Sequence, residues 1–232
     1  PFSWRRIRFH GETVKEIVKL GAPVALQDLL VSISFLAITA IVNQLGVIAS
    51  AGVGVAEKVC TFILLVPSAY AQSISAYVAQ NIGANQPQRA KRGMVYGIAT
   101  SLLFGVFMSY FAFFHGNLLS GLFARDPQVI LAAADYLKAY AIDTLLVSFM
   151  FCFVGYFNGC GKTTFVMFQG LIGAFCVRIP VSYLASKLVP VTLFKIGLAT
   201  PCSTFVQIIL CVLYFLWLGR KEKMSLKQAE VR

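Results

Sequence analysis

Apolar residues dominate the chain between Lys19 and Gly219, in helix-length runs separated by short polar turns. A helix needs about 20 mostly apolar residues to cross the hydrocarbon layer of a bilayer. Open strands would leave backbone groups unpaired in lipid, so each run is predicted to be a helix. Six spans are predicted, over Val18–Leu45, Val47–Gln80, Met94–Leu119, Val129–Asn158, Thr163–Val189 and Phe194–Gly219.

Composition supports lipid as the solvent of these helices. Hydrophobic residues make up 58% of the chain and charged residues 12%, and the mean hydropathy is +0.77. A soluble domain of this size needs more polar surface to cover its core. We therefore predict an all-α membrane protein with one six-helix domain over residues 17–219, a basic connector over residues 1–16 and a basic tail over residues 220–232.

The net charge of +11 is concentrated in alternate loops. Arg125, Lys187 and Lys195 are the only basic residues in one set of loops. The other set and the two ends hold Arg5, Arg6, Arg8, Lys15, Lys19, Arg89, Lys91, Arg92, Lys162, Arg220, Lys221, Lys223, Lys227 and Arg232. This bias predicts that both ends lie in the cytoplasm, in a multi-pass protein of the bacterial inner membrane. The basic groups are expected to contact membrane lipid and not nucleic acid.

No recognisable catalytic, metal or cofactor motif occurs. The six cysteines form no CxxC pair, and His10 and His115 are predicted on opposite sides of the membrane. The segment from Gly155 to Thr164 resembles a phosphate-binding loop, but its first glycine is one residue too early and it follows a predicted helix. We interpret that segment as a tight turn and predict that the protein is not an enzyme.

Ionisable residues within a span are costly unless they face water or a partner, so they are functional candidates. In the first span Asp28, Ser32, Phe35, Thr39 and Asn43 share one side of a helix. In the fourth span Tyr136 and Tyr140 share a face with Asp143, and Met150 lies nearby. A carboxylate flanked by aromatic and methionine side chains suits a proton or an amphipathic cation. We expect Asp28 and Asp143 to exchange the coupling ion and the other named residues to line the substrate surface.

The remaining polar residues of the spans are interpreted as structural. Glu57, Lys58, Gln72 and Arg178 are expected to bond to other helices, and Arg178 precedes a predicted kink at Pro180. Thr200, Ser203, Thr204, Gln207 and Cys211 form a milder polar stripe in the last span. Such residues commonly join helices within membrane bundles.

Several short motifs, in order along the chain, resemble those of the MATE (multidrug and toxic compound extrusion) family of transporters. The most specific is Gln80-Asn81-Ile82-Gly83-Ala84, followed by the basic residues Arg89, Lys91 and Arg92. Further pieces are Leu20–Gln27, Ala49–Lys58, Leu122–Asp126, Asn158–Thr163 and Arg178–Pro180.

The resemblance implies twelve helices in two six-helix lobes, of which this chain resembles the second, with the missing N-terminal lobe as its partner. It also implies antiport, in which inward H⁺ or Na⁺ movement drives export of small cationic, amphipathic compounds, with no other cofactor. Where such family members carry coupling acids, this chain has Val31 and Val147. The roles of Asp28 and Asp143 therefore depend on the physical argument alone.

Two alternatives remain open. A lipid-linked oligosaccharide flippase of the same superfamily would need a cationic groove, whereas the candidate cavity residues are mostly acidic or neutral. A second alternative is an isolated half that transports nothing and acts as an assembly partner.

Overall fold

The computed structural model describes residues 11–230, and side chains up to Lys221. No strand occurs in that part of the chain. Its helices are α1 (Gly11–Asn43), α2 (Val47–Gly83), α3 (Pro87–Phe114), α4 (Gly116–Gly121), α5 (Pro127–Gly159), α6 (Thr163–Leu171), the π-helix η2 (Ile172–Arg178), α7 (Ile179–Lys187), α8 (Leu193–Gly197) and α9 (Ala199–Glu230).

Six helical stretches of the described chain are long and apolar enough to span a membrane. They coincide with the six predicted spans, so the prediction of an all-α six-span bundle is confirmed. The predicted connector over residues 1–16 lies partly outside the described residues, and its last six residues belong to α1. The predicted tail continues α9 as far as Glu230.

Three spans differ from single straight helices. The third predicted span is divided at His115 into α3 and the short helix α4. The sixth is divided at Leu198 into α8 and α9. The fifth contains the π-helix η2 between α6 and α7. Pro180 lies at the first turn of α7, so the irregular backbone precedes the proline that the sequence marks as the kink.

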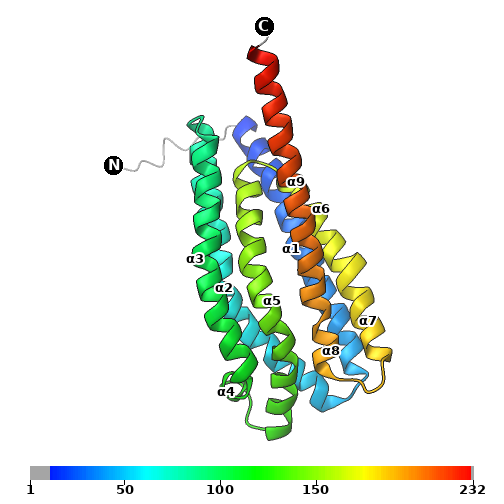
Figure 1. Cartoon of the computed structure of the whole chain (residues 1–232). Helices are drawn as coiled ribbons and strands as arrows, with labels where there is room; N and C mark the ends of the chain where they lie inside the picture. The colour runs from blue at the N-terminus through cyan, green and yellow to red at the C-terminus, as the bar shows by residue number, and fades with distance from the viewer. Residues whose placement is uncertain (1–10, 231–232) are drawn as a thin grey trace, which may run out of the picture.

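Helix α5 is the centre of the bundle, with α2 and α3 on one side and α8 and α9 on the other (Figure 1). Most of its surface is covered by other helices, and its polar residues Asp143, Thr144 and Ser148 are buried. Helix α1 packs against α6 and α7, and also contacts α2. Consequently α5 places its side chains where both halves of the bundle meet.

Glycines bring α2 and α5 into close contact. A Cβ atom at Gly52 would lie 2.6 Å from the Cβ of Ala132, and one at Gly155 would collide with the backbone of Ala71. These contacts show that the two helices run parallel. The resulting register puts Glu57 level with the segment Tyr136–Tyr140.

The two turns at the end of the bundle where α1 begins and α9 ends share one hydrogen-bonding pattern. Gly161 has a φ of 69°, and the Lys162 N–H donates to the Phe157 carbonyl at 2.8 Å. Asn85 has a φ of 57°, and the Gln86 N–H donates to the Asn81 carbonyl at 2.8 Å. Both are Schellman turns, in which a left-handed residue ends the helix. The end of the segment from Gly155 to Thr164 is therefore a tight turn, as predicted, and this turn caps α5.

Charge is divided between the two ends of the bundle. The start of α1, the α2–α3 turn, the α5–α6 turn and the end of α9 lie at one end (Figure 1). The described basic residues at this end are Lys15, Lys19, Arg89, Lys91, Arg92, Lys162, Arg220 and Lys221, whereas Arg5, Arg6 and Arg8 lie outside the described residues. Arg125, Lys187 and Lys195 lie at the opposite end.

Candidate functional site

Asp143 lies in the interior of the bundle, with only 3% of its surface exposed. Its Oδ1 accepts a hydrogen bond of 2.6 Å from the Thr204 hydroxyl of α9. Thr204 also hydrogen-bonds the carbonyl of Thr200, one turn earlier. A buried carboxylate with a single hydroxyl donor keeps acceptor capacity for a proton or a cation.

Two tyrosines extend this group along α5. The rings of Tyr136 and Tyr140 are 5.2 Å apart, and both residues are buried. Thr200 donates to the Tyr140 hydroxyl at 3.4 Å. The Tyr136 hydroxyl is buried and has no hydrogen-bond partner among the described residues. Tyr136, Tyr140 and Asp143 therefore share one interior region, as the spacing on α5 predicted.

Helix α2 brings two further groups to this region. Cys60 is buried in the same hydrophobic cluster as Tyr136 and Tyr140. Glu57 is half-buried, and its Oε1 is enclosed without a hydrogen-bond partner in the described part of the chain. The parallel register of α2 and α5 explains this proximity.

Arg178, at the end of η2, is buried and does not snorkel toward the bundle end. Its Nη1 donates to the Ser34 hydroxyl of α1 at 3.2 Å, and its guanidinium lies 4.4 Å from the ring centroid of Phe35. It also interacts electrostatically with Asp143. Arg178 thus ties α1 to the interior around Asp143.

The remaining first-span candidates lie apart from this interior group. Asp28, Ser32 and Asn43 are exposed on α1, and the Ser32 hydroxyl bonds only to the Asp28 carbonyl within its own helix. Asn43, the last residue of α1, accepts a hydrogen bond from Ser50 in the first turn of α2. No hydrogen bond or ion pair joins Asp28 to Asp143 in the described structure.

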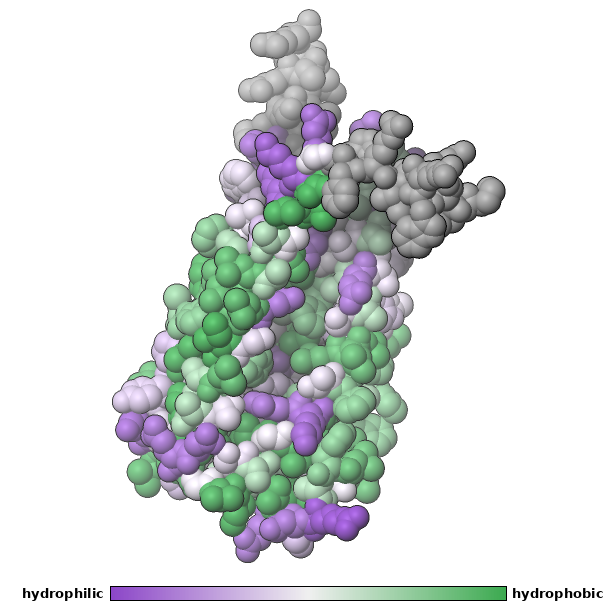
Figure 2. Space-filling view, turned by 180° about the vertical axis from the view of Figure 1, so that it is seen from behind, coloured by the Kyte–Doolittle hydropathy of each residue, from purple (hydrophilic) through white to green (hydrophobic). Residues whose placement is uncertain are grey.

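Helix α2 carries a second exposed polar strip. Lys58, Thr61 and Gln72 are exposed, and Gln72 donates to the Ser68 hydroxyl at 3.4 Å. Figure 2, which views the side where α1 and α2 lie nearest, shows polar residues along a hollow between two apolar flanks. Polar strips on spans are expected to face water or protein and not lipid.

Met150 is buried in a separate apolar cluster around Phe153 and Phe157, toward the end of the bundle that holds the termini. Its packing there is shared with Val154 and Cys211. Met150 therefore lies beyond Asp143 along α5, and its side chain packs in this second cluster and not with the residues around Asp143.

Sequence reasoning recognised the α9 polar stripe but not its contact with Asp143. It also gave Ser34 no role. Two hydroxyls four residues apart on α9, Thr200 and Thr204, are the signal that marks the face turned to α5.

The fold and this interior define a polytopic α-helical membrane protein with an acid and hydroxyls in its core. Residues 23–184 match the MatE family model. The chain therefore belongs to the MatE family, the MATE transporters.

Similar proteins agree with this membership. The probable multidrug resistance protein YoeA of Bacillus subtilis is 21% identical over 95% of this chain and 48% of its own length. The multidrug export protein MepA of Staphylococcus haemolyticus is 25% identical over 77% of this chain and 39% of its own length. The chain thus spans about half the length of the curated relatives it matches.

Solved structures show the same fold. A crystal structure of MATE in complex with MaL6 superposes with a TM-score of 0.83, at 15% identity, over 98% of this chain and 50% of that one. A MOP superfamily transporter from Pyrococcus furiosus gives a TM-score of 0.80, at 21% identity, over 89% of this chain and 45% of that one. The chain therefore has the fold of one lobe, as predicted.

Proposed function

We propose that this chain is the C-terminal lobe of a secondary antiporter that exports small cationic, amphipathic compounds in exchange for H⁺ or Na⁺. The observation that carries the proposal is the buried Asp143, whose carboxylate has a hydroxyl donor and tyrosines around it. Family membership and the multidrug names of relatives support this activity over the flippase alternative.

Burial favours the neutral form of a carboxyl group, whereas a nearby cation favours the charged form. Protonation of Asp143 and binding of a cation near it are therefore expected to exclude one another. Exclusion of this kind couples two opposite fluxes when the site alternates between the two sides of the membrane.

Asp28 is proposed to act at the exposed polar face of α1, where a partner lobe would enclose water and substrate. Phe35 connects the two sites, because it is half-buried on α1 and packs against Arg178. Tyr136 and Tyr140 are proposed to line the inner wall, with Met150 deeper along α5.

The lobe is proposed to lie in a bacterial inner membrane with both chain ends in the cytoplasm, opposite Arg125, Lys187 and Lys195. The basic end of the bundle supports this orientation. A six-helix N-terminal lobe of the same protein is the proposed partner, because the matched structures are about twice as long.

The test is drug export by the full-length protein in proteoliposomes, with pH and Na⁺ gradients imposed separately. We expect one of the two gradients to drive export, and the Asp28→Asn, Asp143→Asn double variant to lose it. Normal export by the double variant would refute the proposed coupling. Export by this lobe in the absence of the other would refute the two-lobe assignment.

A further inference from the structure

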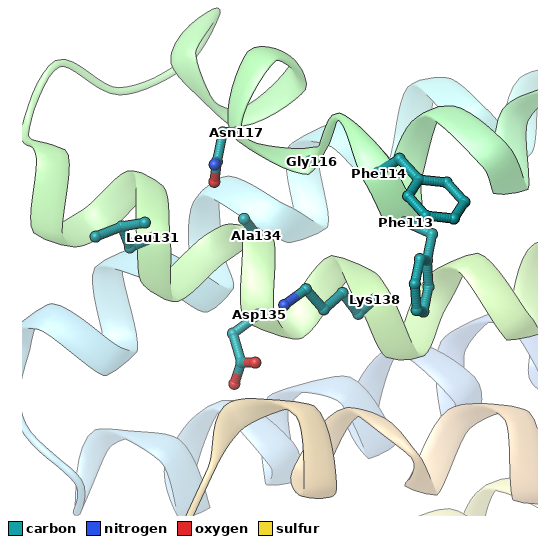
Figure 3. A pocket seen from close by; sticks show the side chains of 8 residues that line it. All are labelled: Phe113, Phe114, Gly116, Asn117, Leu131, Ala134, Asp135 and Lys138. Atoms are coloured by element: carbon teal, nitrogen blue, oxygen red, sulfur yellow. The ribbon is translucent and has the colours of Figure 1, made fainter.

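A hollow of about 380 Å³ lies between the end of α3, the start of α4 and α5, at the end of the bundle away from the termini (Figure 3). Its walls are Phe113, Phe114, Gly116, Asn117, Leu131, Ala134, Asp135 and Lys138. Gly116 lies against Ala134, where a Cβ atom would be in van der Waals contact at 3.4 Å, so α4 packs on α5. The break between α3 and α4 therefore creates the hollow.

Lys138 supplies the positive charge of this hollow. From Leu131 to its end, α5 exposes only Leu131, Lys138 and Ile142, which lie on one strip. The ammonium group has no hydrogen bond or ion pair with another described residue. An unpaired ammonium beside apolar surface in a membrane requires an anionic or polar partner.

The other polar groups favour an anionic ligand. Asn117 and Lys138 project into the hollow from opposite walls (Figure 3). The Asp135 carboxylate is turned toward α8, where its Oδ2 accepts the Phe194 N–H at 3.0 Å. Asp135 is therefore engaged in holding α8, and the hollow presents two side-chain donors.

The rim is apolar and faces outward. Phe114 is 66% exposed, Leu131 is 62% exposed and Phe113 is 42% exposed. Because α3 ends beside this rim, the hollow lies at the level of the membrane–water interface, where aromatic side chains are common. A ligand that suits both parts has an anionic group for Lys138 and Asn117 and an apolar portion for the rim.

We propose that this hollow binds the phosphate headgroup of an anionic phospholipid from the adjacent leaflet. The Lys138 ammonium and the Asn117 amide donate to phosphate oxygens, and the acyl chains lie along Phe114 and Leu131. The positive charge disfavours the cationic compounds that the lobe is proposed to export, so this site is distinct from the transport pathway around Asp143.

The experiment titrates the detergent-purified full-length protein with phosphatidylglycerol and counts retained lipids by native mass spectrometry. We expect Lys138→Ala to bind this lipid about fivefold more weakly. One basic residue near an anionic lipid surface contributes about 1 kcal/mol, which corresponds to that factor. Arg125→Ala is the matched control, because Arg125 is an exposed cation in the loop just before α5. It should leave retention unchanged.

Two further arms distinguish the alternatives. Phosphatidylcholine titration measures apolar binding alone, and inorganic phosphate measures a free anion. The proposal would be overturned if Lys138→Ala and Arg125→Ala reduced phosphatidylglycerol retention equally, or if neither reduced it. Displacement of the lipid by millimolar inorganic phosphate would also overturn it. If Lys138→Ala fails to fold, Asn117→Leu provides the same comparison, with the expected loss smaller but selective for phosphatidylglycerol.

Discussion

Few side chains interact with the buried carboxylate of Asp143, and each of them can be removed by a single substitution. The Thr204 hydroxyl donates to it, and Arg178 acts on it through charge. A buried carboxylate is sensitive to such partners because little water screens them. Removal of the Thr204 hydroxyl should therefore alter ion coupling before it alters the fold.

Thr204→Val keeps the shape of the side chain and removes the donor to Asp143. A hydrogen bond to a charged group contributes about 1.5–3 kcal/mol. We expect the proton or Na⁺ dependence of export by the full-length protein to shift by about tenfold or more in ion concentration, since about 1.4 kcal/mol is a factor of ten. Thr204→Ser should retain the parental dependence, and identical behaviour of the Val and Ser variants would contradict a direct role for this bond.

Arg178→Met removes the guanidinium from Ser34 and from the Phe35 ring. The lost charge-assisted bond and cation–π contact predict about 2 kcal/mol of destabilisation. Thermal unfolding of the full-length protein in detergent measures it, with the exposed Lys58→Ala as the control. Unchanged stability in Arg178→Met would show that α1 is held to η2 by other contacts.

For individual side chains, the sequence alone predicted that Tyr136, Tyr140 and Asp143 share a face, because the spacing of residues along one helix determines which of them lie on the same side. It could not predict that Thr204 reaches Asp143, because that contact depends on the rotation of α9 against α5. It likewise placed Asp28 and Asp143 in one role, although Asp28 is exposed on α1 and Asp143 is buried on α5.

Among the helices, glycines determine how closely two of them approach, and one stretch of π-helix interrupts the regular α-helical backbone. Gly155 allows the backbone of α2 to touch α5, and η2 inserts a π-helix into the fifth span. The number and extent of the spans follow from apolar run length, so they were predictable. The π-helix was not, because its widened turns depend on packing that includes Gly173 against Gln207 of α9.

Gly155→Ala should separate α2 from α5, because the new methyl group would meet the Ala71 backbone, which cannot rotate away. Overpacking of this kind costs about 1–3 kcal/mol. The matched control is Gly54→Ala on α2, where a Cβ atom has no neighbour within 4 Å. Equal unfolding temperatures for the two variants would contradict the close contact of the helices.

The whole molecule has basic residues concentrated at one end and a length about half that of its relatives. Charge bias along the sequence predicted that both ends lie on one side of the membrane, and the start of α1 and the end of α9 lie at the same end of the bundle (Figure 1). We propose that the exposed polar residues of α1 and α2 face the partner lobe in the full-length protein.

Orientation in the membrane is tested by single cysteines in a cysteine-free background. We expect Arg125→Cys to react with an impermeant thiol reagent in intact cells, because it lies at the sparsely charged end. Lys162→Cys should react only after permeabilisation. The reverse pattern would place the basic end outside and contradict the proposed topology.

The most direct test of an ion-coupled lobe is a comparison of two modes of transport by full-length Asp143→Asn. Substrate exchange without a gradient requires binding and alternation, whereas accumulation against a gradient also requires ion coupling. We predict that the variant retains exchange and loses gradient-driven accumulation. Accumulation at the parental level would contradict coupling through Asp143.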